Sequence, residues 1–502
     1  MQSKITTVAF RGITTTTVEV QVHLSNGLPS MAIVGLADKA VAESKERVPA
    51  ALSSMGLALP PKRIAINLAP ADLSKEGSHY DLPIAMGLLI AMGVLPTDSI
   101  DGMVVMGELS LDGGIAAVQG VLSAAIGAAS MDFGLICPEA CGNEAAWGGP
   151  LNIIAAPSLM ALVNHLRGEQ VLTPPVADHC IPAERPENMR DLVGQYTARR
   201  ALEVAAAGGH NLLMMGPPGA GKSMLAARLP GLLPLLTAAE ALEVTMINSL
   251  AGQLPEGGLI IQRPFREPHH SSSIAALVGG GTKARPGEVS LAHGGVLFLD
   301  ELAEWQRGHL DALRQTVESG KAVVSRANHH VTYPARFQLI AAMNPCRCGY
   351  LGDPARACTK APLCSRQYLS RISGPMLDRF DMMIEVGEVP ISAMSRSGEG
   401  EDTAVILERV HAAREFASIR PQQKDNPINA QLPPDRLEDA VRLQAKASKL
   451  IEDAAEKQGL SARGYHRVLK VARTIADLDH SGDVTTAHAG EALQYRRLPV
   501  QA

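Results

Sequence analysis

Short apolar runs alternate with helical stretches in the middle of the chain. Three of these runs, Asn211–Met215, Val296–Leu299 and Phe337–Ala342, are almost wholly apolar. Strands that are buried on both faces of a parallel sheet have this composition, whereas half-exposed strands alternate apolar and polar residues. The pattern predicts a doubly wound α/β domain over residues 189–390.

The first 167 residues combine strand-like and helical patterns. Strands are predicted at Ile5–Val8, Val18–His23 and Ile64–Leu68. The run Leu82–Leu95 predicts a buried helix, because it is interrupted by two glycines and is shorter than the ~20 residues that a bilayer-spanning helix needs. We expect an α+β domain over residues 1–167 and no membrane span.

Two breaks in periodicity divide the rest of the chain. Residues 168–188 contain four prolines and no regular apolar spacing, which is typical of a linker. A second break, rich in Ser, Gly and Glu, lies within 388–402, and helical spacing follows it. That spacing is carried by Val405, Leu407 and Val410, and again by Val468, Leu469, Ala472 and Ile475. We therefore expect a linker and a small helical domain over residues 391–502.

Composition and charge narrow the class of protein. Of the 502 residues, 46% are hydrophobic and 19% are charged, which suits a globular chain with several cores. The net charge of -5 provides no overall basic field, so nucleic-acid binding would depend on local basic patches. No export signal is visible at the N-terminus, and seven cysteines are too few for a disulfide scaffold. We expect a cytoplasmic protein.

One segment has the pattern of a phosphate-binding loop. It reads Gly216, Pro217, Pro218, Gly219, Ala220, Gly221, Lys222 and Ser223, and Met224 opens the helical stretch that follows. The segment comes directly after a predicted strand, as a P-loop requires. Glycines let backbone N–H groups approach phosphate oxygens, Lys222 would reach the β- and γ-phosphates, and Ser223 would bind Mg²⁺. We expect ATP and Mg²⁺ as cofactors.

A pair of carboxylates follows another predicted strand. Asp300 and Glu301 end the run Val296–Leu299. Such a pair at this distance after a P-loop is expected to place Asp300 on the Mg²⁺ ion and Glu301 beside the attacking water as general base.

The central region, which contains these residues, resembles the AAA+ ATPases. It specifically resembles the magnesium-chelatase-like group, which includes a competence protein. The matching segments are Asp191–Gln195, Arg263–His270, Pro286–Glu288, Gly294–Glu301, Asn344–Cys346 and Ser373–Asp381. The resemblance extends over nearly the whole chain and implies an AAA+ P-loop core with a helical lid.

The resemblance also implies roles for individual residues. Val193 and Gly194 would hold the adenine, Asn344 would orient the water, and Arg463 would be a sensor in the lid. Arg379 would be the arginine finger that completes the site of a neighbouring subunit in a homo-hexamer, with Arg371 as a rival. A surface salt bridge is an equally good interpretation of Arg463.

Residues 320–333 predict a β-hairpin between the acidic pair and Asn344. In related ring motors such a hairpin projects into the pore. Its candidate contacts to nucleic-acid backbone are Lys321, Arg326, His329 and His330. A solvated hairpin that packs on its neighbour is an equally good alternative. His269 and His270 could likewise face the pore, or be hydrogen-bonded structural residues.

Four cysteines lie close together in the sequence: Cys346, Cys348, Cys358 and Cys364. Four thiolates in one loop can form a tetrahedral Zn²⁺ site, although the Cys-x-Cys spacing is tighter than usual. The alternative is a set of free thiols in a surface loop. Cys137, Cys141 and Cys180 are interpreted as structural.

The N-terminal region resembles the proteolytic domain of Lon proteases, which has the ribosomal protein S5 domain 2-like fold. The resemblance rests on Lys75–Ala85 and Gly107–Ile115. It places His79 at the position of the catalytic Ser and Leu122 at that of the Lys. Ser78 is adjacent, but no lysine occurs from 81 to 167 to activate it. We expect a non-proteolytic domain that serves assembly or the binding of a partner or DNA.

The resemblance implies a hexameric DNA motor, with helicase or branch-migration activity on single-stranded and branched DNA. Its process would be recombination during natural transformation. With aromatic residues at only 3%, few base-stacking platforms are available. The alternative is a motor that remodels a protein partner, as in magnesium chelatase, although the Lon-like region is not expected in chelatase subunits. An ATP-dependent protease is disfavoured by the missing Ser–Lys pair.

Overall fold

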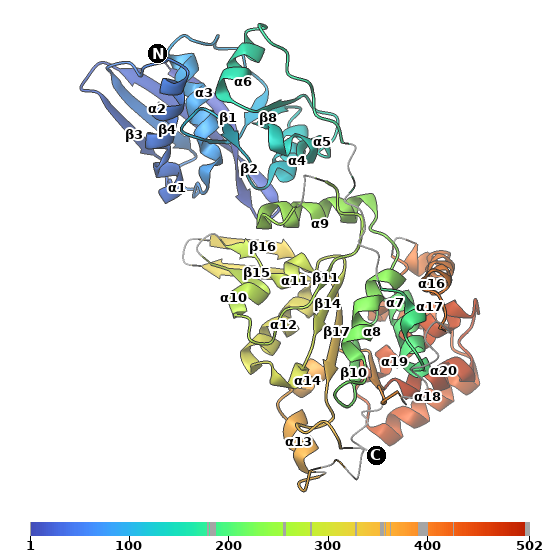
Figure 1. The fold of residues 1–502 in the computed structure, drawn as a ribbon. Coiled ribbons are helices and arrows are strands. Elements are labelled where there is room, and N and C mark those ends of the chain that lie inside the picture. Colours follow the sequence, from blue (N-terminus) through green and yellow to red (C-terminus); the bar gives the residue numbers. More distant parts are fainter. Residues whose placement is uncertain are drawn as a thin grey trace.

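The chain folds into three successive parts. Figure 1 shows the first in blue to cyan, the second in green to orange, and the third in orange to red. The computed structural model describes residues 2–177, 180, 187–254, 258–281, 284–326, 329–351, 356, 358–361, 363–389, 400–424 and 426–496, with only the backbone at 325, 326, 329 and 330.

A mixed sheet organises the N-terminal part. Its described strands run in the order β3-β4-β2-β1-β5-β8-β9. They are β1 (Gln2–Arg11), β2 (Thr14–Ser25), β3 (Ser30–Val34), β4 (Arg63–Ala69), β5 (Met103–Val105), β8 (Gly134–Pro138) and β9 (Ile153–Ala156). β1, β2 and β4 pair antiparallel, whereas β5, β8 and β9 continue the sheet parallel to β1. The predicted strands lie inside β1, β2 and β4.

The second half of this sheet was not predicted. β5, β8 and β9 are short and buried at every residue, so they lack the alternation that marks a half-exposed strand. The α+β interpretation therefore holds for the first half only, because the second half consists of parallel strands linked through helices.

Helices cover the N-terminal sheet. They are α1 (Lys39–Ala42), α2 (Ser44–Ser54), α3 (Asp81–Ala91), α4 (Val121–Ala129), α5 (Gly142–Ala146) and α6 (Leu159–Leu166), and a small ribbon is formed by β6 (Glu108–Leu109) and β7 (Ile115–Ala116). The predicted buried helix is confirmed as α3, which packs against β1, β2 and α2 and is buried at every residue. Among the described helices, none combines the length and the apolar character that crossing a bilayer requires.

The central part contains the predicted parallel sheet. Its described strands run in the order β11-β14-β17-β10-β18 and all pair in parallel. They are β10 (Leu212–Met215), β11 (Phe265–Arg266), β14 (Val296–Leu299), β17 (Gln338–Met343) and β18 (Met382–Glu385). Strand β10 shows why the run is wholly apolar. Leu212 and Met214 belong to one core and Leu213 and Met215 to another, so both faces of the sheet are covered.

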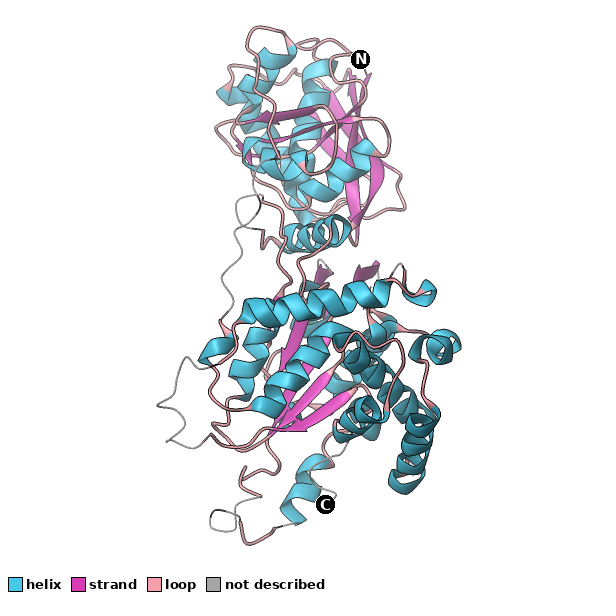
Figure 2. Cartoon of the chain, turned by 90° about the vertical axis from the view of Figure 1, so that its right-hand side faces the viewer, coloured by secondary structure: helices cyan, strands magenta, loops and turns pink. Residues whose placement is uncertain are grey.

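Figure 2 shows helices packed around these strands. The helices are α7 (Tyr196–Gly208), α8 (Lys222–Arg228), α9 (Ala238–Ala251), α10 (Ile274–Val278), α11 (Glu288–Leu291), α12 (Arg307–Ser319), α13 (Leu363–Leu369) and α14 (Gly374–Leu377). The predicted hairpin is confirmed as β15 (Lys321–Arg326) and β16 (His329–Pro334), which pair antiparallel. A second ribbon, β12 (Gly279–Gly280) and β13 (Arg285–Pro286), packs against β15.

Helix α9 joins the N-terminal and central parts, between which it lies in Figure 1. It packs against α4. The Ser249 hydroxyl donates to Glu144 Oε1 at 2.5 Å and accepts from the Gly120 N–H at 2.9 Å. These bonds satisfy a buried carboxylate and the backbone before α4, so they fix how the two parts meet.

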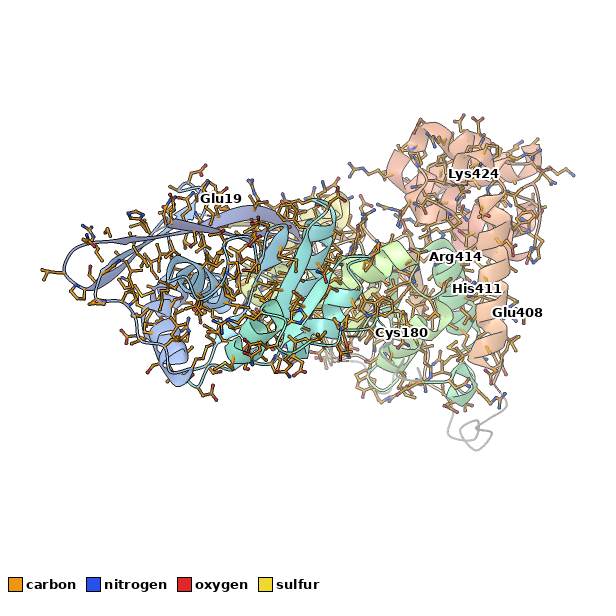
Figure 3. All side chains as sticks on the ribbon, turned by 90° about the horizontal axis from the view of Figure 1, so that it is seen from above. Glu19, Cys180, Glu408, His411, Arg414 and Lys424 are labelled. Atoms are coloured by element: carbon orange, nitrogen blue, oxygen red, sulfur yellow. The ribbon has the colours of Figure 1, made fainter. Side chains whose placement is uncertain are left out.

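The C-terminal part is helical, as predicted. It comprises α16 (Thr403–Ser418), α17 (Pro434–Val441), α18 (Ala445–Gln458), α19 (Ala462–Leu478) and α20 (Thr486–Gln494). The helical spacing that began at Val405 is confirmed as α16. Val405 is 45% exposed, and the buried face is carried by Ile406, Val410 and Ala413. Arg414, labelled in Figure 3, donates to Ala206 O at 2.6 Å and so ties α16 to the end of α7.

This helical part contains a buried ion network, and removing its carboxylate is expected to destabilise the protein strongly. Arg473 and Asp477 are 0% and 1% exposed, and Asp477 accepts from Arg473 Nε at 3.1 Å and from Arg420 Nη1 at 2.5 Å. Asp477→Ala would leave both guanidinium groups without their counter-charge. We expect it to lower the free energy of unfolding by about 3–5 kcal/mol, measured by urea denaturation.

The control is Asp483→Ala, because Asp483 and its partner Arg442 are 51% and 66% exposed. This change should cost less than about 1 kcal/mol. Equal stability of the two variants would contradict the assignment of the buried network.

Candidate functional site

The carboxyl ends of three neighbouring strands bring the predicted site together. In the sheet, β17 lies between β14 and β10. Met215 is in register with Met343, and Leu299 with Ala341. The segments that leave these strands therefore begin side by side. They carry the P-loop, the acidic pair and Asn344. Residues that are up to about 130 positions apart in the sequence therefore meet at one edge of the sheet.

The P-loop surrounds a buried ammonium group. Lys222 is 8% exposed, and its Nζ donates to Gly216 O and Pro217 O at 2.9 Å and to Asn344 Oδ1 at 3.2 Å. Burial lowers the pKa of Lys222, while the nearby Asp300 acts in the opposite direction. The predicted lysine and the predicted sensor are thus in direct contact. Helix α8 begins at Lys222, two residues earlier than expected.

The glycines of this loop leave room for a ligand. Gly219 and Gly221 have φ values of 78° and 84°, and a Cβ at either would meet no atom within 4 Å. At Gly216 a Cβ would lie 2.1 Å from Val386 O, so only glycine fits there. An open, positively lined loop of this kind fits a phosphate chain.

Two oxygen ligands suited to Mg²⁺ meet at the loop. Ser223 Oγ donates to Asp300 Oδ2 at 3.0 Å, and Asp300 is held by the Glu301 N–H at 2.8 Å. Hydroxyl and carboxylate oxygens are ligands that Mg²⁺ prefers. A further carboxylate was missed from the sequence. Burial, and after it the charge of Asp300, raise the pKa of Glu267.

Glu301 has a partner that the sequence did not indicate. Its backbone adopts a left-handed conformation, with φ 50°. Its Oε2 lies 3.3 Å from His270 Nδ1, and the His270 ring lies 4.2 Å from that of His269. His270 therefore belongs to the acidic pair rather than to the hairpin. The contact arises because the connection between β11 and α10 passes the end of β14.

The predicted adenine segment is connected to the P-loop. Gly194 and Gln195 have positive φ values of 67° and 52°. Gln195 Nε2 donates to Ala220 O at 3.2 Å and to Gly387 O at 2.6 Å. Val193 and Gly194 thus begin a turn whose next residue joins the P-loop to the end of β18. Gln195 was not predicted as a site residue, although it lies in the matching segment.

Two predicted arginines converge on one carboxylate. Arg379 Nη2 lies 2.6 Å from Glu318 Oε2, and Arg463 Nη2 lies 4.0 Å from Glu318 Oε1. Arg379 is 9% exposed in the single chain, whereas Arg463 is 64% exposed. The rival Arg371 is 44% exposed and pairs with Glu304 at 2.9 Å. Glu318 was missed, because its role depends on the end of α12 meeting α14 and α19.

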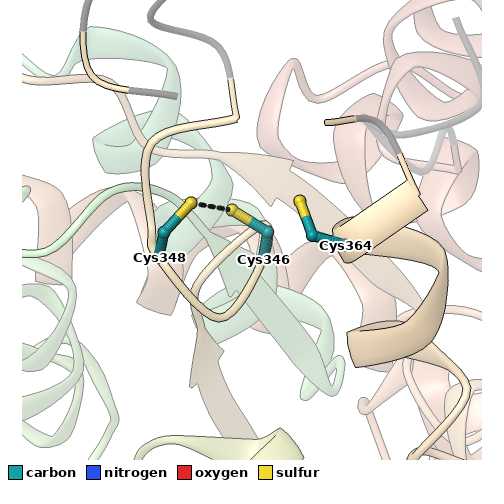
Figure 4. Close-up of side chains that lie close together, drawn as sticks. All are labelled: Cys346, Cys348 and Cys364. Atoms are coloured by element: carbon teal, nitrogen blue, oxygen red, sulfur yellow. Dashed lines mark hydrogen bonds between the residues drawn. The ribbon is translucent and has the colours of Figure 1, made fainter. Parts of the chain in front are cut away.

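Three of the four clustered cysteines meet in space (Figure 4). The Sγ atoms of Cys346, Cys348 and Cys364 all lie within 4.8 Å of one another. Cys358 is half-buried in the same loop and is not part of this group of three. Of the remaining cysteines, Cys137 and Cys141 are buried as expected. Cys180 is exposed and lies outside the cluster.

Two side chains of the first hairpin strand are exposed. Lys321 is exposed at the start of β15, and Val323 is 50% exposed. Arg326 and His329 are paired across the hairpin by their backbones. The side chains of Arg326, His329 and His330 lie outside the described residues.

The N-terminal region offers its candidate serine no basic partner among the described contacts. Ser78 Oγ donates to Glu108, while Lys75 Nζ donates to Pro70 O. His79 is buried with a ring nitrogen 2.9 Å from Val8 O, and burial lowers its pKa to about 4. Leu122 is buried in α4. Ser78 and His79 line a cavity of about 680 Å³ that extends to the base of the hairpin at Tyr333.

Comparison with known families agrees with this geometry. The family description "Magnesium chelatase, subunit ChlI" matches residues 188–394. The descriptions "Subunit ChlI of Mg-chelatase" and "Magnesium chelatase, subunit ChlI C-terminal" match residues 20–140 and 400–496. The first match spans the P-loop, the acidic pair, Asn344 and Arg379.

Individual relatives extend the match to the full length. The chain is 44% identical to the competence protein ComM of Haemophilus influenzae, over 98% of this chain and 96% of that protein. It is 42% identical to the Escherichia coli protein YifB, over 99% and 97%. It is 28% identical to the magnesium-chelatase 38 kDa subunit of Cereibacter sphaeroides, over 32% and 54%. The chain therefore belongs to the magnesium-chelatase-like AAA+ family that includes ComM and YifB.

Proposed function

We propose that this protein is a cytoplasmic ATP-driven DNA motor that forms a hexameric ring and acts on branched recombination intermediates. Membership of an AAA+-type family indicates ATPase activity with ATP and Mg²⁺. The observation that carries the proposal is the pair of contacts at one sheet edge, Lys222 with Asn344 and Ser223 with Asp300. These are the groups that phosphoryl transfer needs in one place.

We assign each residue at this edge of the sheet a separate role in ATP hydrolysis. Lys222 and the backbone of Gly216–Ser223 would hold the phosphates, and the oxygens of Ser223 and Asp300 would hold Mg²⁺. Bound Mg²⁺ would offset the negative charge of the phosphates. Glu301 would accept a proton from the attacking water, with His270 limiting the positions that its carboxylate can take. Asn344 would orient that water.

Assembly would complete the site. Arg379 would reach the γ-phosphate of the neighbouring subunit once it is released from Glu318, and Arg463 would act from the helical lid. We assign residues 1–167 to a non-proteolytic Lon-like domain, 168–188 to a linker, 189–390 to the AAA+ core and 391–502 to the linker and lid. The non-proteolytic assignment is supported by Lys75, whose Nζ donates to Pro70 O, because Lon-type cleavage needs a lysine that activates the serine.

The DNA target is supported by full-length similarity to a competence protein and by the hairpin. The test measures ATP hydrolysis with no DNA, single-stranded, duplex and four-way branched DNA. Strong stimulation by branched DNA, together with ATP-dependent branch movement, would support the motor. Hydrolysis that is equal under all four conditions would refute it.

Replacing Lys321 tests quantitatively whether the hairpin contacts the DNA backbone. As a phosphate contact, Lys321 should bind DNA regardless of sequence. Lys321→Ala is expected to weaken binding of all DNA substrates and to reduce the slope of log affinity against log salt by about one. Fluorescence anisotropy with labelled DNA measures both. Lys446→Ala, an exposed lysine on α18, is the matched control, and equal effects of the two changes would exclude a specific role for Lys321.

A second candidate function is the remodelling of a protein partner. A chelatase family model matches residues 20–140, so the N-terminal region is no evidence against this candidate. The similarity to the magnesium-chelatase 38 kDa subunit supports it, although that match covers 32% of this chain. ATP hydrolysis that is insensitive to DNA but stimulated by a purified protein would favour this function.

A further inference from the structure

The loop after Asn344 brings together thiols from separate turns of the chain. Cys346 is fully buried, and its Sγ lies 3.1 Å from that of Cys348. Cys364, in the first turn of α13, lies within 4.8 Å of both. Cys358 is half-buried and lies in the same loop, six residues before Cys364. All four residues belong to the described part of the chain.

The local backbone is shaped to present these thiols. Gly349 has φ 85° and its N–H donates to Cys346 O at 3.0 Å, which closes a turn around Cys348. The Ala361 N–H donates to Cys358 O at 3.1 Å, and the Cys364 N–H to Lys360 O at 3.1 Å. The fold of the loop compensates for the short Cys-x-Cys spacing, because it brings the Cys364 thiol back to those of Cys346 and Cys348.

We propose that Cys346, Cys348, Cys358 and Cys364 form a Zn²⁺ site. Four sulfur ligands at about 2.3 Å from a tetrahedral zinc lie roughly 3.8 Å apart. The Sγ atoms of Cys346, Cys348 and Cys364 lie within 4.8 Å of one another, which suits three of these ligands, and Cys358 would supply the fourth. Sulfur-only tetrahedral sets select Zn²⁺ or iron–sulfur clusters. Four ligands also leave no open position, so the zinc is structural and takes no part in hydrolysis.

The proposed zinc site lies beside the nucleotide site, where it would hold Asn344 in position. Cys346 follows Asn344 by two residues, and Ser365 Oγ on α13 donates to Pro345 O at 2.7 Å. On its other side the loop contacts the P-loop, where a Cβ at Gly349 would lie 2.4 Å from Pro218 Cδ. The zinc would clamp the segment bearing Asn344 between the P-loop and α13. This second step rests on the proposed ATPase function, whereas the zinc site itself does not.

Metal analysis of the purified full chain tests the site. Inductively coupled plasma mass spectrometry of protein from zinc-replete cells should find about one zinc per chain. Cys346→Ser and Cys364→Ser should lose it. Cys180→Ser is the matched control, because Cys180 (labelled in Figure 3) is exposed and outside the cluster. It should keep the metal.

A measurement on the unaltered protein remains decisive if the variants fail to fold. Titration with a mercurial thiol reagent should release one zinc, detected with a chromogenic chelator, as four cysteines react together. No zinc in the native protein, iron with visible absorbance, or a disulfide between Cys346 and Cys348 by mass spectrometry would each overturn the site.

The clamping step has its own readout. Zinc-depleted protein should bind a fluorescent ATP analogue with unchanged affinity, while kcat falls on the order of 10²-fold because Asn344 is misplaced. Zinc that is present but removable without any change in kcat would refute the clamp and leave the site standing. Absence of ATPase activity in zinc-loaded protein would instead count against the proposed function.

Discussion

Replacing Glu301 by Gln is expected to lower kcat for ATP hydrolysis by about 10²–10⁴-fold and to leave ATP binding intact. The amide keeps the shape of the carboxylate but cannot accept a proton from the attacking water. The Ser223–Asp300 pair and the Lys222 contacts do not involve the Glu301 side chain, so nucleotide affinity should persist. Steady-state phosphate release and binding of a fluorescent ATP analogue measure the two quantities.

The matched control is Glu408→Gln, an exposed carboxylate on α16 that Figure 3 labels. It should hydrolyse ATP at the rate of the unaltered protein. A Glu301→Gln variant that keeps more than about a tenth of the activity would show that another group is the base. Glu267, whose pKa is raised by burial and by the charge of Asp300, would then be the first alternative to test.

Replacing Arg379 by Ala is expected to lower kcat by about 10³-fold in the assembled protein. The reason is that an arginine supplied by the neighbouring subunit offsets the charge of the transition state. The sharpest test of this role is to mix subunits of two inactive variants. Subunits with Arg379→Ala have an intact Glu301, and subunits with Glu301→Gln have an intact Arg379. Mixed rings should therefore recover activity that neither variant has alone.

The ion pair between Arg379 and Glu318 requires a separate control. Glu318→Gln removes the 2.6 Å pair but keeps the guanidinium group. If the loss in Arg379→Ala came from the broken pair, Glu318→Gln would be equally inactive and mixing would restore nothing. Arg371→Ala tests the rival, which pairs with Glu304. It should stay within a few-fold of the unaltered rate, and the reverse result would make Arg371 the finger.

The parallel core and its phosphate loop could be predicted because their signals are local. Wholly apolar runs such as Val296–Leu299 identify strands that are buried on both faces, and glycine spacing identifies the loop. The short strands β5, β8 and β9 escaped prediction because a short apolar run fits a buried strand or part of a buried helix, and no motif follows these runs to decide between the two, as the acidic pair does after Val296–Leu299. The spacing from Val405 to Val410 predicted the helix α16, but which of its residues are buried depends on the packing of α16 against α7.

The sequence by itself determined that the chain has a P-loop ahead of an acidic pair, a hairpin before Asn344, and a helical C-terminal part. Each depends on residues close together along the chain, where backbone geometry and hydrophobic periodicity act directly. Only the tertiary structure decided that His270 meets Glu301, that Glu318 gathers Arg379 and Arg463, and that Cys364 returns to Cys346. These contacts join residues 18 to 145 positions apart. Such pairs form when packed helices and sheet edges bring side chains within reach, and no local propensity encodes that approach.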